Sequence, residues 1–406
     1  MSPPIVSLSL VNVSNAGAPA AGEHRREHCI LAADLRASLN LEVGDQIRVG
    51  FPFPFAGGAA GNTAIFTIHH DGAAGSGLQI FANTSADEFV DDGQDGGVYK
   101  LYGLGGQPSL PADLATIWNV APSETRTDGV VLAGDSHFIE PSADLAAKYF
   151  RELVTIGDAD RRVILLVPHG GAIDQHTSLQ IPPFRGALTT ASATAWECEG
   201  AWAAGQTAAR WHITANELQE RSFPGLWRIV HEGAPYQPGV HFQYAVALHG
   251  FRWDTDSTRK GIILGGRASR ADKHAVMNAI RDAILNDAAL GQPEVDLVAF
   301  YIANTAGIPD DAYPALNQAW NAGFDFASKA GLSNDNLVNR LSPNADPILH
   351  DHRGGIQIEQ STAVRASATL RAAVARGIGA AVEGLLARSP RRSTTSWTRR
   401  PRGRIS

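Results

Sequence analysis

Four residues with the chemistry of a metal site lie at three distant places in the chain, each close behind a short apolar segment. They are His169, Asp174, His249 and Glu359. In open, largely parallel α/β sheets, ligands bind in the crevice beyond the carboxyl ends of the strands, so these side chains are predicted to converge there. Two imidazoles and a carboxylate form a three-ligand set typical of catalytic zinc, with the fourth position left for water, and a further carboxylate can act as base.

The chain between His169 and Asp174 begins with two glycines, Gly170 and Gly171. Glycine turns sharply without a steric penalty from a Cβ atom. We therefore expect the backbone to fold the His169 and Asp174 side chains around one ion.

Several short motifs, in a fixed order, resemble the poly-γ-glutamate hydrolase family, whose members are related to the zinc carboxypeptidases. The motifs are His169–Thr177, Leu248–Gly250, Gly265–Gly266 and Gly355–Arg365, with weaker phrases at Trp196–Gly200 and Trp211–Thr214. The resemblance covers roughly residues 128–387. It implies a zinc-dependent amide hydrolase in which His169, Asp174 and His249 hold Zn²⁺ and Glu359 takes the proton of the attacking water.

The chain departs from the family pattern at two positions of the first motif. Asp174 stands where the family has glutamate, and His176 stands where the family has glycine. Aspartate is an acceptable zinc ligand, although its shorter side chain requires the loop to move inward. The order of the motif favours Asp174 as the third ligand, and a rearranged site that uses His176 instead stays open.

An anionic peptide or γ-glutamyl polymer is the substrate that the resemblance implies, and its carboxylates require cations. Arg252, three residues after His249, is the first candidate, and Arg267 and Arg365 are secondary candidates. Each of these arginines also has an interpretation as a surface or packing residue, and for Arg267 and Arg365 that interpretation is favoured. The alternatives are a zinc carboxypeptidase or amidase for another acidic peptide or acylamino compound, and a non-catalytic binding module on the same fold.

The composition is that of a globular protein rather than a nucleic-acid or membrane protein. Residues 388–406 contribute seven arginines and no acids, so with a net charge of −7 the remaining chain carries −14. An acidic body is a poor binder of nucleic acid. No run of about 18 apolar residues is present, and no basic residue precedes the apolar patch 5–13, so a cytoplasmic location is expected. Two cysteines, Cys29 and Cys198, exclude a disulfide framework.

The distribution of turn residues and apolar periodicity predicts five parts of the chain. These are a mobile lead-in (1–22), a small β domain (23–104), a connector (105–128), a zinc hydrolase domain (129–387) and a disordered basic tail (388–406). The fold class expected is α/β, with a mixed, largely parallel sheet flanked by helices, like the zinc carboxypeptidases, preceded by a small β-barrel-like domain. That first domain is interpreted either as a substrate-presenting or assembly module or as a structural appendage.

Within these parts, alternation and helical spacing predict the individual elements. Strands of the β domain are expected at Asp45–Val49, Ala64–Ile68, Gly77–Phe81 and Gly97–Tyr102, with a helix at Ala32–Leu39. Strands of the hydrolase domain are expected at Val130–Leu132, Val163–Val167, Ala195–Cys198, Trp211–Thr214, Tyr244–Leu248, Gly261–Leu264, Val295–Ile302 and Ile356–Ile358. Helices are expected at Ser142–Leu153, Arg270–Asn286, Asp311–Lys329 and Ser361–Leu386.

Two further residues are given provisional roles. His212 is interpreted as a hydrogen-bonded core imidazole on a strand. Glu199 is a candidate for a second acid lining the cleft.

Overall fold

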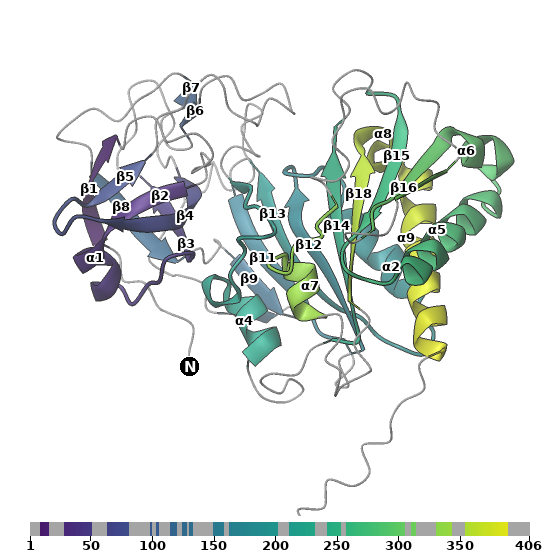
Figure 1. The fold of residues 1–406 in the computed structure, drawn as a ribbon, viewed down its shortest axis with the longest axis horizontal. Coiled ribbons are helices and arrows are strands. Elements are labelled where there is room, and N and C mark those ends of the chain that lie inside the picture. The colour runs from purple at the N-terminus through teal and green to yellow at the C-terminus, as the bar shows by residue number, and fades with distance from the viewer. Residues whose placement is uncertain are drawn as a thin grey trace, which may run out of the picture.

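A computed structural model gives the fold of the chain (Figure 1). It describes residues 9–15, 28–50, 63–80, 98–99, 103–104, 114–119, 124–127, 130–132, 149–157, 162–201, 211–231, 242–252, 257–304, 310–313, 330–342 and 354–388. Within these ranges the chain forms a barrel near the N-terminus and a large sheet covered by helices. The α/β class predicted from the sequence is confirmed.

The large sheet holds ten strands within the described ranges, in the order β10-β9-β11-β13-β12-β14-β18-β15-β16-β17. They are β9 (Glu124–Thr127), β10 (Val130–Leu132), β11 (Tyr149–Thr155), β12 (Val163–Gly171), β13 (Thr194–Ala201), β14 (Tyr244–Phe251), β15 (Lys260–Gly265), β16 (Val298–Ile302), β17 (Asp311–Tyr313) and β18 (Gly355–Ser361). The central strands β13, β12, β14 and β18 are mutually parallel. Their carboxyl ends therefore lie at one edge of the sheet.

Helices cover both faces of this sheet, which explains why the central strands are apolar on both sides. On β14, Val246 and Leu248 face one hydrophobic core, while Ala245 and Ala247 face the other. The first core is shared with α2 (Ile181–Gly186), α5 (Arg270–Leu285), α8 (Thr362–Ala366) and α9 (Ala368–Ala387). The second is shared with α4 (Pro224–His231) and α7 (Leu337–Leu341), and α6 (Gly291–Leu297) precedes β16.

The N-terminal domain is a closed barrel with the strand order β1-β5-β2-β4-β3-β8. Its elements are β1 (Ser9–Asn15), β2 (His28–Ala32), α1 (Ala33–Ser38), β3 (Gln46–Gly50), β4 (Thr63–Gly72), β5 (Leu78–Ile80) and β8 (Leu114–Asn119), and a separate hairpin consists of β6 (Val98–Tyr99) and β7 (Gly103–Leu104). Side chains such as Leu31, Ile47 and Phe66 are fully buried inside the barrel. The predicted small β-barrel and its helix are confirmed.

The barrel extends beyond the predicted bounds at both ends. β1 lies within the expected mobile lead-in, yet it pairs with β5 and β8. β8 lies within the expected connector and closes the barrel against β3, and β9 in that connector joins the large sheet. Pairing between strands distant in the sequence stabilises these segments. Local composition contains no information about such pairing, so it could not predict these strands. Residues 389–406 of the expected tail lie outside the described part of the chain.

The predicted helix Ser142–Leu153 is wrong where the structure describes it. Residues 149–155 form β11, which pairs antiparallel with β13. The buried residues Phe150, Glu152 and Val154 recur at every second position, which is the period of a strand. Glu152 is a polar residue on the buried side, so an apolar count along the segment conceals this alternation.

Three further elements differ from prediction. The predicted helix Asp311–Lys329 begins as β17, and its residues 314–329 lie outside the described ranges. The predicted strand Val295–Ile302 starts only at Val298, because residues 291–297 form α6. The predicted strand Trp211–Thr214 contains no strand residues.

The predicted helix Ser361–Leu386 is two helices, α8 and α9, separated at Ser367. The Ser367 hydroxyl accepts a hydrogen bond from the Leu370 amide at 3.3 Å and so caps α9. Ser361 begins α8 without a side-chain cap, because its hydroxyl bonds to the Arg259 carbonyl and the Gly261 amide. Within the described ranges, no helix combines the length and the apolar character needed to cross a membrane.

A fully buried carboxylate, Glu152 on β11, joins the sheet to α4. It accepts hydrogen bonds from Trp196 Nε1 at 2.6 Å and from the amides of Gly225 and Leu226 at 2.8 and 2.7 Å. These amides lie in the first turn of α4, where an anion is favoured by the helix dipole.

Glu152→Ala is therefore expected to lower the free energy of unfolding by about 3 kcal/mol, because three buried donors lose their acceptor. Chemical denaturation measures this change. Asp282→Ala, which removes an exposed acid from α5, serves as the control and should stay within about 0.5 kcal/mol of wild type. An equally small effect of Glu152→Ala would show that these bonds contribute nothing net.

Candidate metal centre

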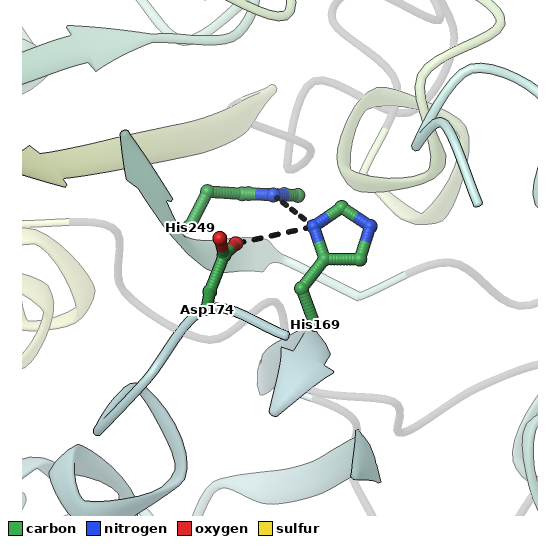
Figure 2. Close-up of side chains that lie close together, drawn as sticks. All are labelled: His169, Asp174 and His249. Atoms are coloured by element: carbon green, nitrogen blue, oxygen red, sulfur yellow. Dashed lines mark hydrogen bonds and ion pairs between the residues drawn. The ribbon is translucent and has the colours of Figure 1, made fainter. Parts of the chain in front are cut away.

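The side chains of His169, Asp174 and His249 converge at the carboxyl ends of β12 and β14 (Figure 2). His169 Nδ1 lies 3.2 Å from Asp174 Oδ2 and 3.2 Å from His249 Nδ1. One ligand atom from each residue lies within 4.8 Å of the other two. The structure thus brings together three residues that are separated by up to 80 positions in the sequence.

A tight turn after β12 carries Asp174 back over His169. The Asp174 amide donates to the His169 carbonyl at 2.7 Å, which closes the turn. Gly171 has a φ of +68°, and a Cβ there would come within 2.6 Å of the Gly200 carbonyl oxygen. This position therefore requires glycine, in agreement with the prediction from the Gly170-Gly171 pair.

The other ring nitrogen of His169 fixes which of its atoms carries a proton. His169 Nε2 lies 2.8 Å from the Ile213 carbonyl oxygen, which can only accept, so Nε2 is the donor. In a neutral imidazole, Nδ1 then presents a lone pair. That lone pair points at the Asp174 carboxylate and at a second imidazole nitrogen, so the arrangement requires either a proton or a cation between them.

Two of the three separations between these ligand atoms fit a tetrahedral metal ion. Zinc bonds to nitrogen and oxygen of about 2.0–2.1 Å place neighbouring ligand atoms of a tetrahedron about 3.3 Å apart. The two measured separations of 3.2 Å match that edge. A ligating histidine that donates its second N–H to a backbone carbonyl, as His169 does to Ile213, is also usual in metal sites.

The surroundings keep two of the three candidate ligands, Asp174 and His249, in the forms that bind metal. Burial raises the pKa of the Asp174 carboxyl. The His169 hydrogen bond and the charges of His169, Arg365 and His249 together lower that pKa by more than burial raises it, so the net pKa lies below its usual range. The Gly250 amide also donates to Asp174 Oδ2 at 3.0 Å. Burial and the charge of His169 lower the pKa of His249 to about 3, which leaves a neutral imidazole. An ionised carboxylate and neutral imidazoles are the ligand forms that metals require.

Glu359 lies on β18 directly opposite His249 of β14. Residues opposite each other on neighbouring strands point to the same face of the sheet, about 4.8 Å apart at the backbone. The Glu359 carboxylate accepts a hydrogen bond from Gln357 Nε2 at 2.9 Å, and Gln357 in turn accepts one from Asn336 Nδ2 at 2.9 Å. Glu359 is therefore beside the three-residue group but is not one of its members.

His176 is not a member of the group either. Its side chain is exposed, and its backbone has a φ of +74°. A non-glycine residue rarely adopts this conformation. Of the two alternatives, the structure brings Asp174 to His169 and His249.

Arg365 is close to the centre, but it is buried and its guanidinium bonds to backbone carbonyls of the protein. It is 6% exposed, and it donates to the carbonyls of Gln360 at 3.0 Å and Gln175 at 2.7 Å. A Cβ on Gly250 would come within 2.3 Å of its guanidinium carbon. The sequence predicts a substrate-binding residue at this position, whereas in the structure Arg365 secures the turn that carries Asp174.

The other two predicted arginines lie in different places. β15 runs antiparallel to β18, so Arg267, two residues beyond β15, lies beside Gly354 at the amino end of β18. Five residues of strand, about 17 Å, separate that point from Glu359, and the structure does not bring Arg267 to the centre. Arg252 directly follows β14, two residues beyond Gly250, and is exposed.

The structure adds residues that the sequence assigned elsewhere or did not single out. His212 lies outside any strand, with its ring 4.2 Å from that of His169. Ile213 supplies the backbone acceptor for His169, a role that no side-chain pattern signals. Gln357 lies two residues before Glu359, so the spacing of a strand could have placed both on one face. Glu199 is buried opposite Gly170 on the neighbouring strand β13.

Neither a protein-family model nor a curated protein sequence matches the chain. Among solved structures, the chain is similar to one described as a bacteriophage poly-gamma-glutamate hydrolase, with 14% identity, a TM-score of 0.37, and coverage of 60% of this chain and 92% of that one. It is also similar to the N-acetylmuramoyl-L-alanine amidase AmiC2 of Nostoc punctiforme, with 12% identity, a TM-score of 0.27, and coverage of 56% and 98%. At these TM-scores the two similarities do not indicate what this chain does.

Proposed function

We propose that the chain is a zinc-dependent hydrolase that cleaves amide bonds of the γ-glutamyl type. The observation that supports this most directly is the convergence of ligand atoms from His169, Asp174 and His249, which lie within 4.8 Å of one another with two separations of 3.2 Å. Two imidazoles and one carboxylate are a set used by catalytic zinc, with one position left open. When bound there, zinc would make water acidic near neutral pH and polarise the carbonyl to be cleaved.

In this proposal Glu359 is the general base. Its place opposite His249, outside the ligand group, suits a residue that takes a proton from the attacking water and returns it to the leaving amine. The hydrogen bond from Gln357 holds the carboxylate in one orientation.

The acidic substrate follows from cations near the centre. Arg252 is exposed just beyond the strand that carries His249. On the other side, His176 lies near Arg371 and Arg365, since burial and then the charges of these two arginines lower the pKa of His176. The exposed Arg252 and the half-buried Arg371 would attract an anionic peptide or γ-glutamyl polymer.

The test combines metal analysis with activity. We expect about one zinc ion per chain, hydrolysis of γ-linked polyglutamate in preference to α-linked polyglutamate, loss of activity with a chelator, and recovery with zinc. Preference for an α-linked or acylamino substrate would identify the carboxypeptidase or amidase alternative. Zinc binding without any hydrolysis would leave a binding module, and a protein that binds no metal would contradict the proposal.

A further inference from the structure

The barrel contacts the part of the chain that holds the large sheet through Ile65, which packs in the second core, and through residues 211–222, which we call the bridging segment. Gln46 of β3, 1% exposed, is the centre of this contact. The Gln46 side chain donates to the Glu217 carbonyl at 2.7 Å and accepts from the Gln219 backbone amide at 2.9 Å. The Gln46 backbone amide donates to Ser222 Oγ at 3.0 Å. One barrel residue thus makes hydrogen bonds to three residues of the bridging segment.

Charged and aromatic contacts reinforce this attachment. Arg221 of the bridging segment forms ion pairs with Glu42 and with Asp45, the latter at 3.3 Å. Near the other end, the guanidinium carbon of Arg48 lies 5.5 Å from the centre of the Trp211 ring. The barrel therefore holds the bridging segment at both of its ends.

The bridging segment also contains the residues that contact the His169 ring of the metal centre. Ile213 provides the carbonyl that accepts from His169 Nε2, and His212 places its ring against that of His169. The Glu217 amide donates to the Thr214 carbonyl at 2.8 Å, which makes a tight turn between the part held by Gln46 and Ile213. A short and rigid path thus leads from the barrel to His169.

We propose that the barrel is a positioning element for the metal centre, and that Gln46 is its principal positioning residue. The idea rests on the proposed zinc site. The groups that accept the second N–H of a metal-binding histidine set its ring orientation, and their loss costs about 10- to 100-fold in metal affinity. Here that acceptor is a backbone carbonyl, so its position depends on whatever holds the bridging segment. This gives the barrel a role distinct from substrate presentation and from a structural appendage.

The test compares full-length Gln46→Ala with full-length Arg36→Ala. Arg36 bonds to Asp71 and to the Leu41 carbonyl, and its charge acts on Glu42 and Asp45, all within the barrel region, so its loss perturbs the barrel while every Gln46 hydrogen bond stays in place. Zinc dissociation constants are measured by competition with a chromophoric chelator, well below the melting temperature of each metal-free protein. We expect Gln46→Ala to bind zinc about tenfold more weakly than wild type, and Arg36→Ala within about twofold.

Each outcome decides the proposal separately from the proposed function. If wild type binds zinc and Gln46→Ala binds it within twofold of Arg36→Ala, the positioning role is wrong while the zinc site stands. If wild type itself binds no zinc, the proposed function fails first. If Gln46→Ala does not fold, Ser222→Ala, which removes only the acceptor for the Gln46 amide, replaces it under the same thresholds. A lower melting temperature with unchanged zinc affinity would mark the barrel as a structural appendage.

Discussion

Asp174→Asn is expected to weaken zinc binding by at least about 100-fold and to abolish hydrolysis, whereas His176→Gly should leave both within about twofold of wild type. The loss of zinc affinity should exceed 100-fold, because even removal of a residue that only hydrogen-bonds to a metal ligand costs 10- to 100-fold in affinity. Asparagine keeps an oxygen that can accept from the Gly250 amide, so the turn should persist. What disappears is the negative charge, and with it the anionic ligand.

This pair of variants decides between the two alternatives that the sequence left open. His176 is exposed with a φ of +74°, so glycine restores an unstrained backbone and removes only the imidazole. Isothermal titration with zinc, together with the melting temperature of each metal-free protein, measures the effect. A large loss in His176→Gly and a small one in Asp174→Asn would mean that the turn rearranges on binding metal and that His176 is the third ligand.

The sequence predicted the convergence of the centre because one topological rule carries most of it. His169, His249 and Glu359 each follow or end an apolar strand segment, and the central strands are parallel. Their carboxyl ends therefore lie together, as the rule requires. The two glycines after His169 were likewise sufficient to predict a sharp turn, because glycine lacks a Cβ atom. In the structure, only a residue without a Cβ fits beside Gly200.

The same rule was misleading where a strand reverses. β15 ends in Gly265 as β14 ends near Gly250, and the local residues look alike, but β15 is antiparallel to β18. Strand direction depends on the whole path of the chain, so the sequence could not exclude Arg267 from the centre. The burial of Arg365 could not be foreseen for a different reason, since it depends on the space above Gly250, a residue 115 positions earlier.

The bridging segment shows what residue types cannot indicate. Its contribution to the centre is a backbone carbonyl at Ile213, and any residue could supply one. Its attachment to the barrel depends in part on Gln46, whose side chain bonds there to backbone groups of residues 217 and 219. Contacts of this kind leave no motif, and they become visible only when the two domains are placed together.

Glu359→Gln is expected to lower kcat about 10²- to 10⁴-fold, which is the usual contribution of a general base. Zinc content and zinc affinity should stay near those of wild type, because Glu359 lies outside the ligand group. Glutamine is nearly the same size and keeps an oxygen that can accept from Gln357, so the orientation of the side chain should survive. Steady-state kinetics on γ-linked polyglutamate, with metal analysis of the same samples, measures both quantities.

Glu199→Gln provides the matched control, because it changes in the same way a buried glutamate on β13, which pairs with the other side of β12. We expect its kcat to remain within about tenfold of wild type, well short of the loss expected from removing a general base. If Glu359→Gln loses its zinc, the residue is a ligand and not a base. If Glu199→Gln shows the larger loss of kcat with its zinc intact, the proton is taken on the β13 side of the centre, and the role assigned to Glu359 belongs to Glu199.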